Sequence, residues 1–297
     1  MSIISKLLHD TIYAVAYRRS GDDSPFHIIK SSWRYWYADQ ILFKDKDKLW
    51  LFVEKMDRLW HKGIISVSLY DGHKFGLFSD ILEEEFHLSY PMVFKKEDAY
   101  YMIPETADSN KVILYKSTDF PYKWHQHKTL LENCHCVDSN VFEFGGHWYL
   151  ITCEMDAEMG AYTRLQLYNA DDIENGLLEA CEEYNASSTF HFDCRGGGQI
   201  FYANGNCLRP IQCGDAKTYG KSLRIDKIEI IKEYLYSECR KTYTIEDFKF
   251  NNTIHATGAH TYGNCGGIEL IDVKIQELAH PIVHILKIFR KLLKKQY

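Results

Sequence analysis

The sequence lacks any long hydrophobic run. No stretch of its 297 residues approaches the ~20 consecutive apolar residues that a membrane-spanning helix needs. The first residues, MSIISKLLHDTIYAVAYRR, contain neither a proper apolar core nor a small-residue cleavage site, so they do not predict a signal peptide. These absences argue against an ordinary helical membrane protein and against secretion.

A disulfide framework and a clear metal motif are also missing. The nine cysteines form an odd number without disulfide-like spacing, and reduced thiols in a cytoplasmic protein are the simpler interpretation. Cys134-His135-Cys136 resembles one half of a metal clip, but no second pair of ligands has zinc-like spacing. We therefore expect no metal site and no cofactor, and nothing in the sequence indicates a divalent cation.

A general excess of positive charge is absent as well. The formal net charge is −6, and the segment from Lys274 to the end carries six basic residues against one acid. The remaining body is therefore strongly acidic, which argues against a nucleic-acid-binding surface.

One pattern recurs five times along the chain. Each copy has a polar start, a short apolar strand, a turn and a second apolar strand, which predicts a β-hairpin. Successive copies begin about 50 to 60 residues apart, the spacing of propeller blades. Further strand candidates such as GIISVSLY and KVILYKS follow several hairpins. The five copies span residues 36–54, 87–105, 136–154, 194–212 and 258–273.

These repeats predict an all-β fold, a five-bladed β-propeller over residues 1–275. The N-terminal strands TIYAVAYRR and FHIIKSS would complete the last blade and close the ring. A β-sandwich is the alternative, because regular short strands alone do not separate the two folds.

Residues 276–297 predict a C-terminal basic amphipathic helix. Pro281 suits its first turn, and six apolar residues share one stripe: Ile282, Ile285, Leu286, Phe289, Leu292 and Leu293. Lysine and arginine fill much of the remainder, so residues 278–297 are expected to lie on an anionic membrane surface. The alternative is a helix that docks on the propeller or on another subunit.

The hairpin geometry predicts where the polar residues gather. In an antiparallel pair joined by a tight turn, the first strand starts on the rim where the second strand ends. Polar groups at these positions should converge on one mouth of the central funnel and form a binding site on a rigid frame. The residues concerned are Asp39, Ser89, Tyr90, Asp138, Arg195 and His260 at the starts, and Glu54, Glu105 and Gln212 at the ends.

Four acids in this set are the candidate catalytic residues: Asp39, Glu54, Glu105 and Asp138. Clustered, partly buried carboxyl groups repel one another, which raises the pKa of at least one and produces an acid/base pair or a nucleophile. They can also accept hydrogen bonds from sugar hydroxyls. The alternative for each acid is a purely structural bond to backbone amides of the next blade.

The segment Arg195-Gly196-Gly197-Gly198 is the second constellation. Glycine amides beside a guanidinium suit an anionic group such as phosphate, although glycines also mark bulges or crowded strands. Arg209 and Gln212 would add polar groups on the same rim, and Tyr219 a stacking face. His87 and His260 are expected near the mouth as hydrogen-bond donors.

The ordered motifs WYADQ, FVE, HLSYPMVF, YMIPE, VDSNVF and RPIQ resemble a known family. They look like the propeller domain of glucosamine inositolphosphorylceramide transferases and of related bacterial polysaccharide-assembly proteins, over roughly residues 30 to 273. More distantly, the chain is similar to the sugar-active propellers of glycoside hydrolase families 43 and 32. The resemblance implies a sugar-transfer or sugar-cleaving site, with Asp39 and Asp138 matching two acids of those hydrolases.

Two departures from the hydrolases matter. Gln40 stands where they carry proline, and the later blade that presents their general-acid glutamate has Arg195 and glycines here. Hydrolysis of a glycoside needs a proton donor for its poor leaving group, whereas a phosphate leaving group needs positive charge. The exchange of an acid for arginine therefore favours transfer over hydrolysis.

The first hypothesis is a cytoplasmic glycosyltransferase at the inner face of the membrane. It would move a sugar from a phosphate-activated donor, of the sugar-nucleotide or phosphoribosyl-diphosphate type, to a lipid-linked or polysaccharide acceptor. Asp39 or Asp138 would act as general base. The alternatives are a glycoside hydrolase or phosphorylase on the same frame, and a non-catalytic glycan-binding propeller.

Overall fold

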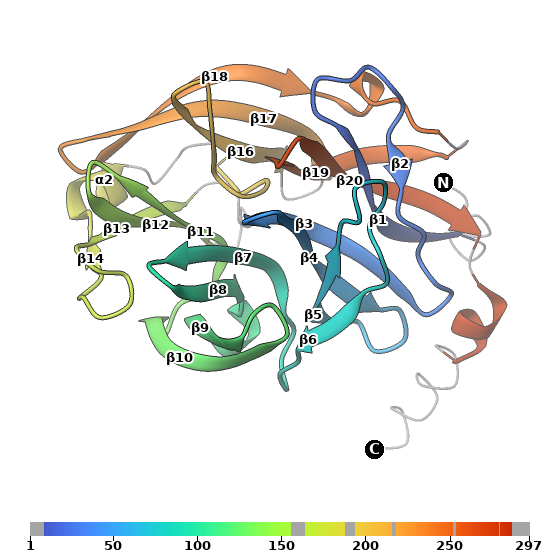
Figure 1. Cartoon of the computed structure of the whole chain (residues 1–297), viewed down its shortest axis with the longest axis horizontal. Helices are drawn as coiled ribbons and strands as arrows, with labels where there is room; N and C mark the ends of the chain where they lie inside the picture. Colours follow the sequence, from blue (N-terminus) through green and yellow to red (C-terminus); the bar gives the residue numbers. More distant parts are fainter. Residues whose placement is uncertain are drawn as a thin grey trace.

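Five four-stranded antiparallel sheets are arranged around a common centre in the computed structural model (Figure 1). The structure describes residues 9–155, 164–187, 194–215, 218–251, 254–278 and 280–286. The prediction of a five-bladed β-propeller is confirmed, and the β-sandwich alternative is wrong, because five separate sheets replace the two layers of a sandwich.

Each of the first four blades is a run of four consecutive strands. Blade 1 contains β3 (Tyr35–Asp45), β4 (Lys48–Asp57), β5 (Lys62–Leu69) and β6 (Ser79–Leu82). Blade 2 contains β7 (Ser89–Lys96), β8 (Ala99–Glu105), β9 (Lys111–Asp119) and β10 (Lys123–Glu132). Blade 3 contains β11 (Cys136–Phe144), β12 (His147–Glu154), β13 (Leu165–Ala170) and β14 (Glu179–Ala180). Blade 4 contains β15 (Phe201–Ala203), β16 (Asn206–Asp215), β17 (Thr218–Ile231) and β18 (Tyr234–Tyr243).

Blade 5 closes the ring by joining the two ends of the chain. Its strand order is β19 (Ala256–Cys265), β20 (Ile268–Leu278), β1 (His9–Arg19) and β2 (His27–Ile28). All 11 residues of β1 pair with β20, from His9 opposite Leu278 to Arg19 opposite Ile268. The N-terminal strands therefore complete the last blade, as predicted.

Apolar side chains fill the spaces between neighbouring blades. Strand alternation gives each sheet two apolar faces, and each face packs on the next blade of the ring. The buried residues accordingly form clusters at the blade interfaces, such as Phe52, Ile65 and Tyr115 between blades 1 and 2. Val15 and Leu51 lie in the cluster that joins blade 5 to blade 1.

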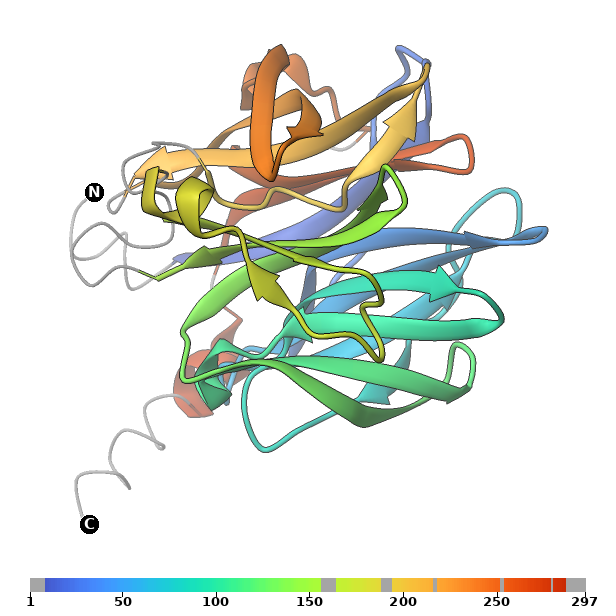
Figure 2. The ribbon, with the colours of Figure 1, turned by 90° about the vertical axis from the view of Figure 1, so that its left-hand side faces the viewer.

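Little of the described chain is helical. The elements are α2 (Glu182–Ser187), two 3₁₀ turns, η1 (Ala107–Ser109) and η2 (Ile245–Asp247), and a helical segment over residues 281–286. None of these helices is long and apolar enough to cross a bilayer. The segment at 281–286 lies at one rim of the disc (Figure 2) and begins at Pro281, as predicted. The rest of the predicted C-terminal helix lies outside the described residues.

Tyr90 forms hydrogen bonds that connect three blades near the centre of the propeller. Its hydroxyl donates to the Gly198 carbonyl at 2.6 Å and accepts hydrogen bonds from the Gly198 amide at 3.0 Å and the Asn140 side-chain amide at 2.8 Å. The side chain is completely buried. Loss of the hydroxyl would leave buried donors without an acceptor.

We expect Tyr90→Phe to lower the free energy of unfolding by about 1–3 kcal/mol, the usual cost of stranding buried polar groups. Urea denaturation followed by tryptophan fluorescence would measure this loss. Tyr202→Phe is the matched control, because the Tyr202 hydroxyl also bonds a carbonyl but its side chain is 61% exposed. If the two variants had equal free energies of unfolding, the hydrogen bonds of the Tyr90 hydroxyl would not stabilise the centre of the propeller.

Candidate active site

The innermost strands of four blades carry the same irregularity. In β3, Ala38 pairs with Glu54 and Ile41 with Phe52, so two residues oppose one, which is a β-bulge. The same two-against-one step occurs in β7, β11 and β19. Its first residue is Asp39, Tyr90, Asp138 or His260, and the first three have positive φ angles of 50°, 44° and 52°. The bulges give these side chains equivalent positions in successive blades.

A central cavity of about 200 Å³ lies at the mouth where these strands begin. It brings together seven of the predicted site residues, contributed by blades 1, 2 and 5 and by the segments that enter blades 2 and 4. They are Asp39, Glu54, His87, Ser89, Glu105, Arg195 and His260. Tyr13, Trp36, Ala38 and Met56 complete the lining. The predicted convergence of strand starts and strand ends on one mouth is therefore found for these residues.

His260 lies between two buried carboxyl groups. Its Nε2 is 2.9 Å from an Asp39 oxygen and its Nδ1 is 2.8 Å from an Asp272 oxygen. Burial alone would lower the pKa of His260, but the two aspartates outweigh it and raise the pKa to about 10. In turn, His260 holds the pKa of Asp39 below its ordinary value despite burial. The ring is therefore an imidazolium at neutral pH and Asp39 an ionised carboxylate.

Asp272 is a site residue that the sequence analysis missed. It is fully buried in β20 and accepts hydrogen bonds from the backbone amides of Asp39, His260 and Thr261. It lies opposite the bulge of blade 5. The equivalent positions opposite the bulges of blades 1, 2 and 3 are occupied by Val53, Pro104 and Thr152. The available signal was an acid inside the apolar run GIELIDV, since buried charges require partners.

Glu54 and His87 form a second pair in the cavity. Glu54 is buried, and its Oε1 lies 3.3 Å from Nε2 of His87. The His87 Nδ1 accepts a hydrogen bond from the Gly63 amide at 2.9 Å, so a neutral ring carries its proton on Nε2, toward Glu54. Burial lowers the pKa of His87, whereas burial and the nearby Asp39 and Glu105 raise the pKa of Glu54 well above its ordinary value. Both shifts favour the neutral form of the side chain.

Glu105 is a partly buried acid whose pKa is raised toward neutrality and beyond. Burial and the negative charge of Asp138 raise its pKa to about 8, although Arg195 opposes the shift. Asp138 itself is buried and lies 2.5 Å from Nε of Arg195. Its pKa is raised by burial, against the effect of that guanidinium. Asp138 therefore lies behind Arg195, and Arg195 rather than Asp138 lines the cavity.

The glycines after Arg195 allow close packing. A Cβ on Gly196 would lie 2.7 Å from the Asp138 Cβ, and one on Gly197 would lie 2.6 Å from the Gln212 nitrogen. The Gly197 amide already donates to the Pro210 carbonyl, and the Gly198 amide to Tyr90. These two amides are engaged within the fold, so the crowded-strand interpretation explains the glycines better than a phosphate cradle does. The same packing explains why regular pairing in blade 4 starts only at Phe201.

Several predicted substrate-binding residues lie away from the central cavity. Tyr90, Gly196, Gly197 and Gln212 belong to the packed centre, where the Gln212 amide donates to the Arg195 carbonyl. Arg209 donates to the Cys194 carbonyl and lines a different cavity, between blades 3 and 4. The side chain of Tyr219 lies outside the described part of the structure.

One group of described residues has donor atoms close enough to share a metal ion: Asp39, His260 and Asp272. His260 faces a carboxyl oxygen with each ring nitrogen, and its raised pKa favours the protonated ring, which has no lone pair for a metal. These residues therefore fit an ion triad better than a metal site. Cys134 and Cys136 belong to no such group in the described chain.

Solved structures share this fold at low sequence identity. A family 117 glycoside hydrolase from Zobellia galactanivorans matches with a TM-score of 0.55 and 12% identity, covering 91% of this chain and 91% of the hydrolase. The catalytic domain of a family 62 α-L-arabinofuranosidase from Coprinopsis cinerea matches with a TM-score of 0.55 and 8% identity, covering 80% of this chain and 90% of that domain. At these identities the likeness is one of fold alone.

Sequence similarity is closer to a transferase. Glucosamine inositolphosphorylceramide transferase 1 from Oryza sativa subsp. indica is 31% identical over 223 residues, and the Arabidopsis thaliana protein of the same name is 29% identical over 218 residues. The matches cover 71% and 70% of this chain but only 29% and 28% of those proteins, so the chain spans less than a third of their length. The family described as "Glucosamine inositolphosphorylceramide transferase 1, N-terminal" matches residues 30–262. The chain belongs to this family.

Proposed function

We propose that the central cavity transfers a glycosyl group from a phosphate-activated donor, of the sugar-nucleotide or phosphoribosyl-diphosphate type, to a hydroxyl of a lipid-linked or polysaccharide acceptor. The observation that carries the proposal is the division of protonation states in one small cavity. Asp39 is ionised, Glu105 titrates near pH 8, and Arg195 supplies a fixed positive charge beside them. Family membership supports glycosyl transfer.

Protonation of Glu54 and Glu105 makes the net charge of the cavity lining compatible with a bound phosphate. If Asp39, Glu54 and Glu105 were all ionised, their charges would outweigh Arg195 and His260 and repel the donor. The raised pKa values of Glu54 and Glu105 disfavour these two charges, so the cavity with both glutamates protonated holds one carboxylate against two cations, which suits an anionic donor. The ionised fraction of Glu105, which grows as the pH approaches 8, is the form that can accept a proton.

Glu105 is the best candidate for the general base. Transfer requires removal of a proton from the acceptor hydroxyl, and a base works best when its pKa lies near the working pH. Asp39 is a weaker base because His260 holds its carboxylate in an ion pair. The role of Asp39 is instead to stabilise positive charge that develops on the sugar as the bond to phosphate breaks.

Arg195 is placed to stabilise the departing phosphate. Its side chain is 12% exposed and lines the cavity, while Asp138 fixes its orientation from behind. A pre-positioned guanidinium needs no reorganisation as charge moves to the leaving oxygen. Phosphate departure needs no proton donor, which agrees with an arginine in this sector of the ring.

The rim that holds the cavity also carries the start of the C-terminal helix, and we propose that this rim faces an anionic membrane surface. Ile282, Ile285 and Leu286 are exposed there, while Val283 is buried against the propeller. An exposed apolar face next to the mouth would bring the site to a lipid-linked acceptor. Nine free thiols support a reducing, cytoplasmic location at the inner face of the membrane.

A donor screen tests the proposal directly. A donor that binds only the folded protein must raise its melting temperature by mass action, so sugar nucleotides and phosphoribosyl diphosphate should be compared in a thermal-shift assay. Stabilising donors would then be tested for transfer to lipid-linked and polysaccharide acceptors by mass spectrometry. Stabilisation by free oligosaccharides alone, or release of sugar from an aryl glycoside without any phosphate donor, would instead support glycan binding or hydrolysis.

We expect Glu105→Gln to lower kcat by about 10²–10⁴-fold, because the variant cannot accept the proton. In the unchanged protein, kcat should rise with pH and level off above the Glu105 pKa of about 8. Initial rates between pH 5.5 and 9.5 would measure both effects. A variant that keeps the rising limb would exclude Glu105 as the base.

Glu105→Gln should also stabilise the protein in alkaline solution. A glutamate whose folded-state pKa lies above its unfolded value contributes stability that is lost as pH rises through about 8. Glutamine has no such titration, so the variant should be more stable than the unchanged protein at pH 9. The expected gain is a few kcal/mol, because each unit of pKa difference between the folded and unfolded states corresponds to about 1.4 kcal/mol. Urea titrations at pH 5 and pH 9 would test this, and Glu132→Gln on exposed β10 is the matched control.

Arg195→Ala should lower kcat for the phosphate-activated donor by about 10²–10³-fold, the usual cost of losing one group that stabilises a leaving oxyanion. The loss should be much smaller with the glycosyl fluoride of the same sugar, whose leaving group carries no phosphate. Arg195→Lys controls for folding, because it keeps a cation beside Asp138. Equal losses with both donors would show that Arg195 acts only on structure.

A further inference from the structure

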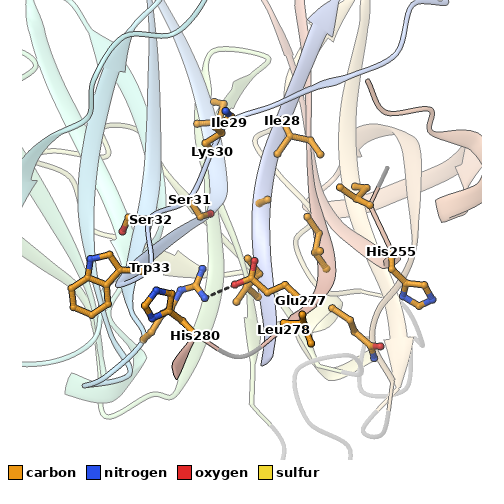
Figure 3. A pocket seen from close by; sticks show the side chains of 16 residues that line it. Ile28, Ile29, Lys30, Ser31, Ser32, Trp33, His255, Glu277, Leu278 and His280 are labelled. Carbon is orange, nitrogen blue, oxygen red and sulfur yellow. Dashed lines mark hydrogen bonds and ion pairs between the residues drawn. The ribbon is translucent and has the colours of Figure 1, made fainter. Parts of the chain in front are cut away.

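A second cavity, larger than the catalytic one, lies on the same rim between blade 5 and the segment that leads to blade 1 (Figure 3). Its volume is about 530 Å³, within the roughly 300–1,000 Å³ typical of small-molecule sites. One wall is apolar and comes from β1, β2 with the segment after it, β20 and the segment before β19. The residues of this wall are Ile12, Ala14, Ile28, Ile29, Ile254 and Ile275.

The opposite part of the cavity is polar and contains a buried arginine. Arg58 is only 4% exposed, and its Nη1 contacts Glu277 at 2.5 Å. Its Nε makes no hydrogen bond within the described residues, and neither do the buried Oγ of Ser31 and Nδ1 of His280. A buried guanidinium nitrogen without an acceptor costs free energy that an incoming oxygen would recover.

The charges of the lining favour an anion. Arg58 and the exposed Lys30 provide two cations, whereas Glu277 is the single acid among the lining residues. The Glu277 side chain is 38% exposed, so solvent screens it more than it screens Arg58. An oxyanion such as phosphate can bond the Arg58 guanidinium and still have Lys30 within the same lining.

The mouth of the cavity is apolar on its outer side. Trp33 lies beside His280, with their rings 5.7 Å apart, and Leu278 is 74% exposed. The exposed Ile282 and Ile285 follow directly in the helical segment. An apolar wall, a buried cation and an apolar mouth together match a molecule that has both an anionic group and a hydrocarbon chain.

We propose that this cavity binds an anionic amphiphile, a lipid phosphate, with the phosphate on Arg58 and the hydrocarbon chain along the isoleucine wall. The proposal that the cavity binds such a lipid depends only on the residues that line it. The further statement that this lipid is the acceptor of the transfer reaction rests on the proposed function. Arg58 follows Glu54 by four residues along β4 and its turn, roughly 13 Å at about 3.3 Å per residue. Arg58 and Glu54 therefore place the two cavities at neighbouring positions along β4 and the turn that follows it.

Dodecyl phosphate, below the concentration at which it forms micelles, is a direct probe for calorimetric titration of the full chain. We expect saturable binding of one molecule per chain. Inorganic phosphate tests the anion alone and dodecyl maltoside the hydrocarbon chain alone, and both should bind much more weakly. If inorganic phosphate or dodecyl maltoside bound as tightly as dodecyl phosphate, the proposal that the cavity binds an anionic amphiphile would be wrong.

Arg58→Gln should weaken dodecyl phosphate binding roughly ten- to a hundredfold, as expected for loss of a charged hydrogen bond. Arg240→Gln, an exposed arginine on β18, is the matched control and should bind normally. Lys30→Glu is a second variant at an exposed position, where folding is not at risk, and it should also weaken binding. Unchanged affinity in both Arg58→Gln and Lys30→Glu would overturn the proposal.

The catalytic variant separates this inference from the proposed function. Glu105→Gln should bind dodecyl phosphate normally, and in a transfer assay Arg58→Gln should raise KM for a lipid-phosphate acceptor while kcat is retained. If no donor supports transfer but the binding pattern holds, the reaction is wrong and the lipid-phosphate site stands. If lipid transfer occurs and Arg58→Gln leaves both binding and KM unchanged, the lipid-phosphate site is wrong.

Discussion

The contact of His260 with Asp39 and Asp272 joins the last blade to the first, and the chemistry of the cavity depends on it. Asp39 belongs to β3, whereas His260 and Asp272 belong to β19 and β20, so the ion triad lies where the ring closes. Two buried carboxylates at this place would repel each other without a cation between them. The imidazolium removes that repulsion, and it also keeps Asp39 ionised in a buried setting. One interaction thus contributes to ring closure and sets the charge of a candidate catalytic residue.

The remaining acids acquire different protonation states because their partners differ. Asp39 faces a cation, Asp138 faces Arg195, and Glu54 faces a histidine whose own pKa is lowered by burial. Glu105 has no comparably close cation among the contacts described and lies near the charge of Asp138, so its pKa rises to about 8. Four acids, two at bulges of innermost strands and two in second strands, are therefore suited to different tasks.

Strand alternation and the spacing of the hairpins were sufficient to predict the five blades, the closing strands and the convergence of Asp39, Glu54 and Glu105. What they did not predict depends on side-chain direction. Arg209 and Gln212 are three positions apart in β16, so their side chains point to opposite faces of the sheet. The Arg209 side chain accordingly lies between blades 3 and 4 rather than at the centre. The bulges were not predictable either, because nothing in the local sequence marks where one extra residue enters a strand.

The glycine-rich segment and Asp272 illustrate a second limit. Glycines after Arg195 fit a phosphate cradle and a crowded crossing equally well in sequence, and only the positions of Asp138, Gln212 and Tyr262 around them decide for crowding. Asp272 is visible in the sequence as an acid within an apolar strand, but its partners come from β3 and β19. Contacts between blades depend on register and twist, which one sequence does not specify.

The position of the two cavities on one rim bears on the choice between transfer and hydrolysis. A hydrolase needs room for water and a soluble glycan, and it gains nothing from a buried arginine and an apolar wall outside its catalytic cavity. A transferase must hold two substrates at once, and the second substrate needs a site of its own close to the first. The cavity at Arg58 lies just after the end of β4, the strand that carries Glu54, and beside the exposed apolar residues of the helical segment. The proposed lipid-borne acceptor would give both cavities and the helical segment a role in a single reaction, whereas cleavage of a soluble glycan would not.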